Sequence, residues 1–189
     1  MTLKFLKSAL VPADWLNDTR KEVALIGRSN TGKSSLINAI FNTNIVRTSN
    51  TPGRTRLINF FDTNGKYRIV DLPGYGYSKI NADDSALINK YVTHYLRTRT
   101  NLTLIVLVVD INVITNKDQE MVQVLKQSNH PFVIALNKTD KLAKSYFANH
   151  QQIIAKYLDV DPNLLIPVSA VKKTNLNALL GTINKYNDQ

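Results

Sequence analysis

One stretch of eight residues indicates the fold of this chain: Gly27-Arg28-Ser29-Asn30-Thr31-Gly32-Lys33-Ser34. An apolar run, residues 23–26, precedes it, and a run with helical character, residues 35–41, follows it. Strand, glycine-rich loop and helix is the context in which the pattern G-x-x-x-x-G-K-[ST] holds phosphate. Gly27 and Gly32 let the backbone bend tightly and approach an anion, and the N–H groups at the start of the helix face it. The stretch therefore predicts a nucleotide-phosphate site.

Two side chains of this loop have defined chemistry. Lys33 would place a point charge beside the β- and γ-phosphates, and Ser34 would offer its hydroxyl to Mg²⁺. We expect the rest of the loop and the first helical residue to line the nucleotide: Gly27, Arg28, Ser29, Asn30, Thr31, Gly32 and Ser35.

Composition limits the class of protein. The 189 residues suit one domain, which we assign to residues 21–189, with residues 1–20 as an extended lead-in packing on its side. The chain has no cysteine, which excludes disulfides, thiolate metal sites and a thiol nucleophile. No signal peptide and no run long enough to cross a bilayer are visible, so we expect a cytoplasmic protein, a monomer, with no membrane partner. The net charge of +10 favours a polyanionic partner, although solubility alone would also explain it.

Elsewhere, predicted strands and helices alternate along the chain. The exception is a hairpin, residues 57–62 and 67–70, around the turn signal Asn64-Gly65. The pattern predicts an α/β fold with a mostly parallel six-stranded sheet, one antiparallel edge strand and helices on both faces. The remaining strands are expected at residues 23–26, 104–109, 132–136 and 164–168, and the helices at residues 33–41, 83–97, 117–127, 145–158 and 176–186.

Polar segments follow several of these strands. The carboxyl ends of parallel strands share one edge of a sheet, where ligands bind, so loops far apart in sequence should converge there. One of these loops is Asp71-Leu72-Pro73-Gly74, which offers a carboxylate for Mg²⁺ and the Gly74 N–H for a γ-phosphate. The alternative interpretation of this segment is a simple turn. In the polar segment Pro52-Gly53-Arg54-Thr55, the Thr55 hydroxyl could complete the Mg²⁺ site only while a γ-phosphate is present. Competing hydroxyls are Thr48, Ser49 and Thr51.

The segment Asn137-Lys138-Thr139-Asp140 indicates the base. The Asp140 carboxylate can accept from both donors on the guanine edge, a pair that adenine lacks. Asn137 can bridge the base and the phosphate loop, and the Lys138 stem can cover the ring. After the next strand comes Val168-Ser169-Ala170, where the Ala170 N–H can meet the guanine O6. In this order the loops predict GTP and GDP rather than ATP as ligands.

Four stretches recur in a known family: Gly27 to Asn38, Pro52-Gly53-Arg54-Thr55, Asp71 to Tyr77, and Tyr95-Leu96-Arg97-Thr98-Arg99. In them the chain resembles the translation-factor-like GTPases and, within these, the EngB/YsxC/YihA family of ribosome-assembly GTPases. The resemblance implies a P-loop GTPase fold (Ras-like G domain) and a cytoplasmic protein of bacterial type that binds GTP with Mg²⁺. It also implies a role in late maturation of the large ribosomal subunit, with the subunit precursor, its rRNA and its proteins as partner.

Catalysis would depend on charge neutralisation and positioning, with Lys33, Thr55 and Gly74 nearest the reaction. A Ras-like enzyme has Gln at the position of Tyr75, and Tyr cannot orient water in the same way, so we expect slow intrinsic hydrolysis. Tyr75 and Tyr77 either pack in the loop or contact RNA. Related GTPases with Asn at the position of Asn30 use K⁺, so K⁺ stimulation is a hypothesis, with a loop-bracing hydrogen bond as the alternative.

The basic residues suggest an RNA-binding surface, and such binding should weaken with salt. Its candidates are Arg47, Arg54, Arg56, Arg97, Arg99, Lys141, Lys144, Lys172 and Lys173. The alternative to a ribosome-assembly GTPase is a guanine-nucleotide-dependent binding module, for example in septation or RNA handling, whose hydrolysis is incidental. An ATP-dependent small-molecule kinase is disfavoured by Asp140 and by the lack of a lid segment.

Overall fold

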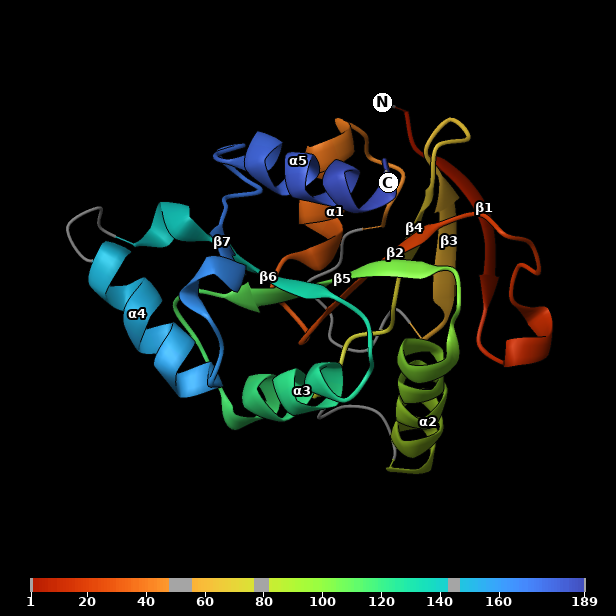
Figure 1. Cartoon of the computed structure of the whole chain (residues 1–189), viewed down its shortest axis with the longest axis horizontal. Coiled ribbons are helices and arrows are strands. Elements are labelled where there is room, and N and C mark those ends of the chain that lie inside the picture. The colour runs from red at the N-terminus through yellow and green to blue at the C-terminus, as the bar shows by residue number, and fades with distance from the viewer. Residues whose placement is uncertain (1, 48–55, 77–81, 143–146, 189) are drawn as a thin grey trace.

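The computed structural model describes residues 2–47, 56–76, 82–142 and 147–188. Within them, seven strands form one sheet in the order β1-β3-β4-β2-β5-β6-β7 (Figure 1). Strands β2, β4, β5, β6 and β7 run parallel, and β3 is antiparallel to both β1 and β4. The strands are β1 (Lys4–Ala9), β2 (Glu22–Gly27), β3 (Ile58–Asp62), β4 (Arg68–Asp71), β5 (Leu102–Asp110), β6 (Phe132–Asn137) and β7 (Leu165–Pro167).

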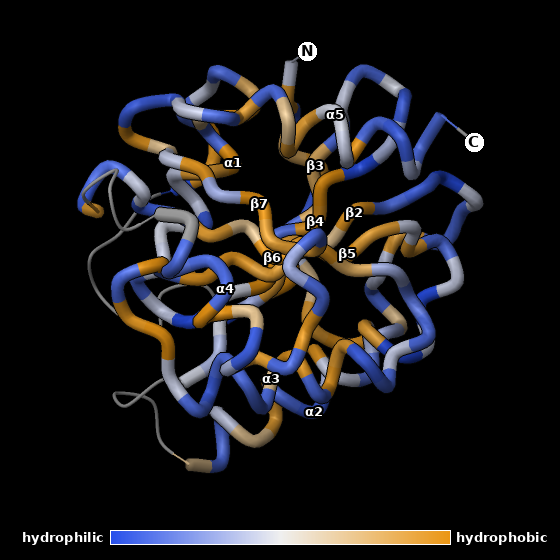
Figure 2. The backbone as a smooth tube through the Cα atoms, turned by 60° about the vertical axis from the view of Figure 1, so that its left-hand side comes forward, coloured by the Kyte–Doolittle hydropathy of each residue, from blue (hydrophilic) through white to orange (hydrophobic). Residues whose placement is uncertain are grey.

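Helices cover both faces of this sheet (Figure 1). Side chains of β2 alternate between the faces: Val23 and Leu25 join one apolar cluster, and Ala24 and Ile26 join the other. Helices α1 and α5 pack into the first cluster, and α2, α3 and α4 into the second. Figure 2 shows the strands as the apolar centre of the molecule. The helices are α1 (Lys33–Phe41), α2 (Ala82–Thr98), α3 (Asn116–Lys126), α4 (Phe147–Leu158) and α5 (Leu176–Asn187).

The predicted fold class is confirmed, and so is the hairpin. Asn64 and Gly65 have φ values of 57° and 81°, the left-handed conformation that this tight turn requires. No described helix is both long and apolar enough to cross a membrane.

The number of strands was wrong, because the lead-in contributes β1. It pairs antiparallel with β3 and forms the edge of the sheet, so the antiparallel strand β3 lies second. The pattern hid this strand for two reasons. Phe5 and Leu6 are consecutive and both exposed, 44% and 38%, which removes the alternation typical of a strand. A register shift between Phe5 and Lys7 breaks the period further.

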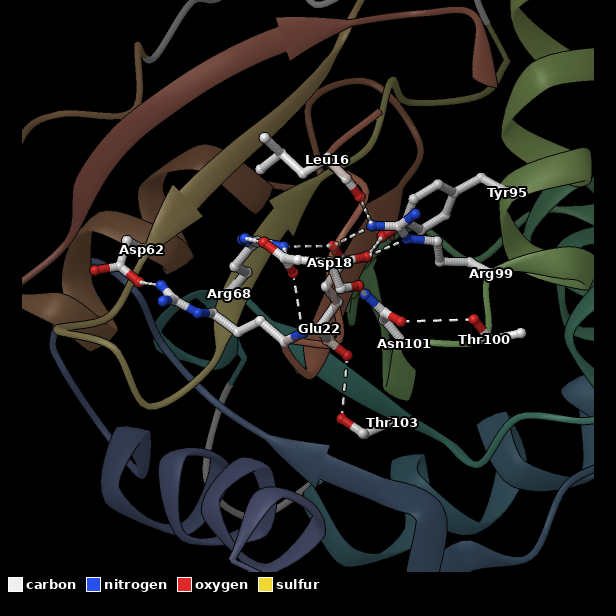
Figure 3. A network of polar contacts seen from close by, with 11 residues as sticks. Leu16, Asp18, Glu22, Asp62, Arg68, Tyr95, Arg99, Thr100, Asn101 and Thr103 are labelled. Carbon is white, nitrogen blue, oxygen red and sulfur yellow. Dashed lines mark hydrogen bonds and ion pairs between the residues drawn. The ribbon is translucent and has the colours of Figure 1, made fainter. Parts of the chain in front are cut away.

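At the amino ends of the central strands, a buried carboxylate organises an ionic network (Figure 3). Glu22, the first residue of β2, is fully buried. Its carboxylate accepts from Arg99 Nε and Nη2, both at 2.7 Å, and from the Tyr95 hydroxyl at 2.6 Å. Arg68 Nη1 lies 3.4 Å from the same group. Two arginines therefore converge on one carboxylate that is out of contact with water.

The network also fastens the lead-in to the domain. Arg68 makes two hydrogen bonds to Asp18, and Arg99 Nη2 donates to the Leu16 carbonyl at 2.6 Å. Trp15 packs edge-on against Tyr95, with ring centroids 5.0 Å apart, and Arg99 lies 6.0 Å from the Trp15 ring. The proposed RNA contact through Arg99 was therefore wrong, because the Glu22 carboxylate holds this guanidinium inside the fold.

Candidate nucleotide site

The phosphate loop depends on two glycines for different reasons. A Cβ on Gly27 would lie 2.5 Å from the Val108 carbonyl oxygen, so β5 leaves no space for a side chain. Gly32 has φ +86°, and a Cβ there would lie 2.6 Å from Asn137 Nδ2. Packing against β5 and β6 thus requires both glycines even before an anion is considered.

Lys33 and Asp71 meet at the centre of this edge. Lys33 opens α1, Asp71 ends β4, and the ammonium group forms an ion pair with the carboxylate. Lys33 is 8% exposed and Asp71 is 1% exposed. The structure therefore brings together the expected phosphate-binding and Mg²⁺-binding groups. Ser34, half-buried, lies on the first turn of the same helix.

Asn137 and Lys138 tie the β6 end to the phosphate loop. Asn137 Nδ2 donates to the Thr31 carbonyl at 2.9 Å, which is the expected bridge to the phosphate loop. Lys138 Nζ donates to the Asn30 carbonyl at 2.6 Å and lies 2.8 Å from Asp110 Oδ2. Beside this ammonium, and with further hydrogen bonds from Asn112, the pKa of the Asp110 carboxyl is lowered, although burial opposes the shift. The sequence alone predicts no role for Asp110.

Asp140 is exposed at the same edge, and the segment that follows β7 orients it. Ser169 Oγ donates to Asp140 Oδ1 at 2.5 Å, and Thr139 Oγ1 donates to the Val168 carbonyl at 3.0 Å. The Ala170 N–H, expected to meet a guanine oxygen, here donates to Asn137 Oδ1 at 3.1 Å. A base would thus compete with Asn137 for this donor.

A cavity of about 720 Å³ adjoins Ala170, between α1 and the loop after β7. This volume is in the range of small-ligand pockets. Its lining includes two expected nucleotide contacts, Ser35 and Ala170, and two cations, Arg47 and Lys173.

The loop that contains Leu72, Pro73 and Gly74 is buried and leads directly into Tyr75. Tyr75 is 7% exposed, and its hydroxyl donates to Asp118 Oδ1 at 2.8 Å. Burial, with the adjacent carboxylate, raises the pKa of Tyr75, so the hydroxyl keeps its proton. Tyr75 therefore packs in the loop rather than facing a partner.

Asp118 was not identified from the sequence. Thr115 and Asp118 have the spacing of a capping box, which predicts a helix start but no partner on another loop.

Some expected residues lie outside the described residues. These are Pro52, Gly53, Arg54 and Thr55, the competing hydroxyls Thr48, Ser49 and Thr51, and also Tyr77 and Lys144.

Comparisons with known proteins agree with this arrangement. A family model described as "50S ribosome-binding GTPase" matches residues 22–138. A probable GTP-binding protein EngB from Malacoplasma penetrans (strain HF-2) is 46% identical over 182 residues, covering 95% of this chain and 97% of that protein.

Solved structures are similar as well. The crystal structure of a probable GTP-binding protein engB superposes with a TM-score of 0.75 at 26% identity, covering 88% of this chain and 98% of that one. NFeoB from S. thermophilus bound to GDP.AlF4- and K+ superposes with a TM-score of 0.63 at 27% identity, over 86% of this chain and 60% of that one.

The fold and the site define a P-loop GTPase, which binds GTP and GDP. More specifically, the chain belongs to the EngB family of GTP-binding proteins, whose G domain is of the ribosome-binding type.

Proposed function

We propose that the residues at the carboxyl edge bind Mg²⁺ and guanine nucleotide in the roles that their chemistry suggests. Lys33 and the loop N–H groups would hold the phosphates, and Asp140 would read the base. Ser34 and Asp71 are hard oxygen donors suited to Mg²⁺, which would neutralise phosphate charge when bound; Thr55 would join them. The observation that carries the proposal is the chain of contacts from the phosphate loop through Asn137 and Ala170 to the Asp140 loop.

Base specificity tests this assignment. Asp140→Asn exchanges a double acceptor for a group with one acceptor and one donor, which suits xanthine better than guanine. We expect XTP to displace labelled GDP more effectively than GTP does in this variant. GTP remaining the stronger competitor would show that Asp140 does not read the base.

We further propose that intrinsic hydrolysis is slow. Tyr75 follows Gly74 at the position where a water-orienting Gln would lie, and its hydroxyl is directed to Asp118. Asn30 has φ 67° and is exposed within the phosphate loop, which is compatible with a K⁺ site, and the similar NFeoB structure is bound to K⁺. Turnover should therefore rise in KCl relative to NaCl at equal ionic strength; equal rates would remove the K⁺ proposal.

For the biological role, we propose a cytoplasmic monomer that gates a step in assembly of the large ribosomal subunit. The description of the matching family model and the net charge of +10 support a ribosomal partner. Exposed cations around the site that could meet RNA phosphates are Arg47, Arg56, Lys141, Lys172 and Lys173. Binding to 50S precursor particles should be stronger with a GTP analogue than with GDP in co-sedimentation. Equal binding in both states would contradict nucleotide gating.

The alternative, a binding module with incidental hydrolysis, is favoured by the buried position of Tyr75. Turnover measured with and without ribosomal particles separates the two. Hydrolysis that stays slow on the particles would support the binding module.

A further inference from the structure

The side chain of Tyr75 links the loop after β4 to helix α3 through a hydrogen bond to Asp118. Its hydroxyl reaches Asp118, which is completely buried at the start of α3. The second carboxylate oxygen of Asp118 accepts from Thr115 N and Thr115 Oγ1, both at 2.8 Å. The helix cap therefore holds this carboxylate in place independently of Tyr75.

The same carboxylate faces the phosphate loop. Arg28 Nε lies 3.6 Å from Asp118 Oδ2, and Arg28 Nη2 donates to the Val113 carbonyl at 2.9 Å. The two loops also meet through their main chains, because Arg28 and Tyr75 form a parallel β-bridge. Asp118 thus contacts both the loop that surrounds the phosphates and the loop that contains Gly74.

Gly76 shows how closely this segment is confined. Its φ is +78°, and an added Cβ would lie 3.1 Å from Lys117 Cδ and 3.3 Å from Arg28 Cγ. The chain after Tyr75 therefore passes close to Arg28 of the phosphate loop and Lys117 of α3, and an added side chain would require these neighbours to shift. The hydroxyl contact of Tyr75 and the close contacts at Gly76 together restrict the position of Gly74, the residue before Tyr75.

We propose that Tyr75, Asp118 and Arg28 form a clamp that positions the Gly74 N–H against the phosphate loop, ready for the terminal phosphate of GTP. The inference rests on the proposed function, in which Gly74 faces the γ-phosphate. Tyr75 is then a positioning residue, since it acts through Gly74 and does not touch the nucleotide. GDP lacks the γ-phosphate, so the clamp affects GTP binding and hydrolysis and leaves GDP binding almost unchanged.

The decisive variant is Tyr75→Phe, which keeps the ring and removes the hydroxyl. We expect about tenfold weaker binding of a non-hydrolysable GTP analogue, at the lower end of what a hydrogen bond to a charged group contributes. GDP affinity should change less than about twofold, and single-turnover hydrolysis should slow about tenfold. The matched control is Tyr157→Phe, which removes a hydroxyl bonded to Asn116 on the same helix, and should change neither affinity.

A role in stability alone gives a different result. If Tyr75→Phe only lowers the melting temperature, or weakens GDP and the GTP analogue equally, the clamp is overturned. Asp118→Asn provides a second variant, because it preserves the shape of the cap and removes the charge facing Arg28. It should also weaken the GTP analogue selectively, and the double variant with Tyr75→Phe should lose no more than about the larger single loss, since both changes open one clamp. Additive losses would refute it.

Lys33→Ala separates this inference from the proposed function. That variant should lose both nucleotides. Retained affinity would contradict the site itself, whereas loss in Lys33→Ala combined with unchanged selectivity in Tyr75→Phe would refute the clamp alone.

Discussion

Replacing Glu22 with glutamine tests what holds the amino end of the sheet together. The substitution keeps the volume of the side chain and removes one negative charge from a fully buried position. The Glu22 carboxylate accepts four hydrogen bonds, three of them from Arg99 and Arg68. A carboxamide has one acceptor oxygen, and its NH₂ group would face the donors that the other oxygen now serves. The variant therefore leaves a guanidinium partly unpaired inside the fold.

The expected loss follows from this geometry. Removing one partner of a buried ion pair destabilises by about 3–5 kcal/mol, because the remaining charge stays desolvated. For a chain of this length each kcal/mol lowers the melting temperature by roughly 2–4 °C, so the midpoint should fall by roughly 6–20 °C.

Urea unfolding, followed by circular dichroism, measures this loss. Trp15, the sole tryptophan, lies against Tyr95 and Arg99, so its fluorescence reports the same region. The matched control is Asp159→Asn, which removes an exposed partner of Lys126 and should leave the midpoint unchanged. A loss below about 1 kcal/mol in Glu22→Gln would refute the reasoning, since it would mean that water or a rearrangement satisfies the arginines.

Three further predictions concern individual contacts. The hydrogen bond from Arg68 lowers the pKa of Asp18 from 3.8 to about 2, so its stabilising contribution should be complete above about pH 4 and be lost as the pH falls through about 2. Asp18→Asn should remove that part of the pH dependence of the urea midpoint; an unchanged acid limb would contradict it. Asp71→Asn should abolish the difference between GDP affinities measured in Mg²⁺ and in EDTA, and a difference as large as in the wild type would show that Asp71 does not serve Mg²⁺. Gly32→Ala should abolish nucleotide binding and destabilise by about 1–2 kcal/mol, because φ +86° and the contact with Asn137 Nδ2 both oppose a side chain. Normal binding of labelled GDP would show that the loop adapts.

The sequence predicted what local pattern and sheet geometry determine. Continuous apolar runs predicted the central strands. Apolar spacing predicted the bounds of the helices to within about two residues of those in the structure. The rule that loops converge at the carboxyl edge placed Lys33 and Asp71 together, and placed Asn137 beside the phosphate loop.

Contacts between distant segments escaped prediction for a physical reason. A charged residue such as Arg99 has the composition of a solvated surface, and only the fold reveals that Glu22 accepts from it. Likewise, the capping pattern pairs Asp118 with Thr115, but it contains no information about Tyr75, which also donates a hydrogen bond to Asp118. Each of these groups is buried by a partner from elsewhere in the chain, and periodicity contains no information about that partner.

Helix α2 lies between β4 and β5 in the chain, and its buried side chains all lie beyond its first six residues. Its buried residues are Ile88, Val92, Tyr95 and Leu96, so its first six residues bury no side chain. At the other end, Tyr95 donates to Glu22, and Arg99, just beyond the helix, pairs with the same carboxylate. Because ion pairs and apolar packing hold the carboxyl end, the first turns of α2 are the part of the helix that tertiary contacts hold least. The ionic network at Glu22 therefore anchors the carboxyl end of α2, whereas the clamp at Asp118 holds Tyr75 and Gly76 at the opposite edge of the sheet.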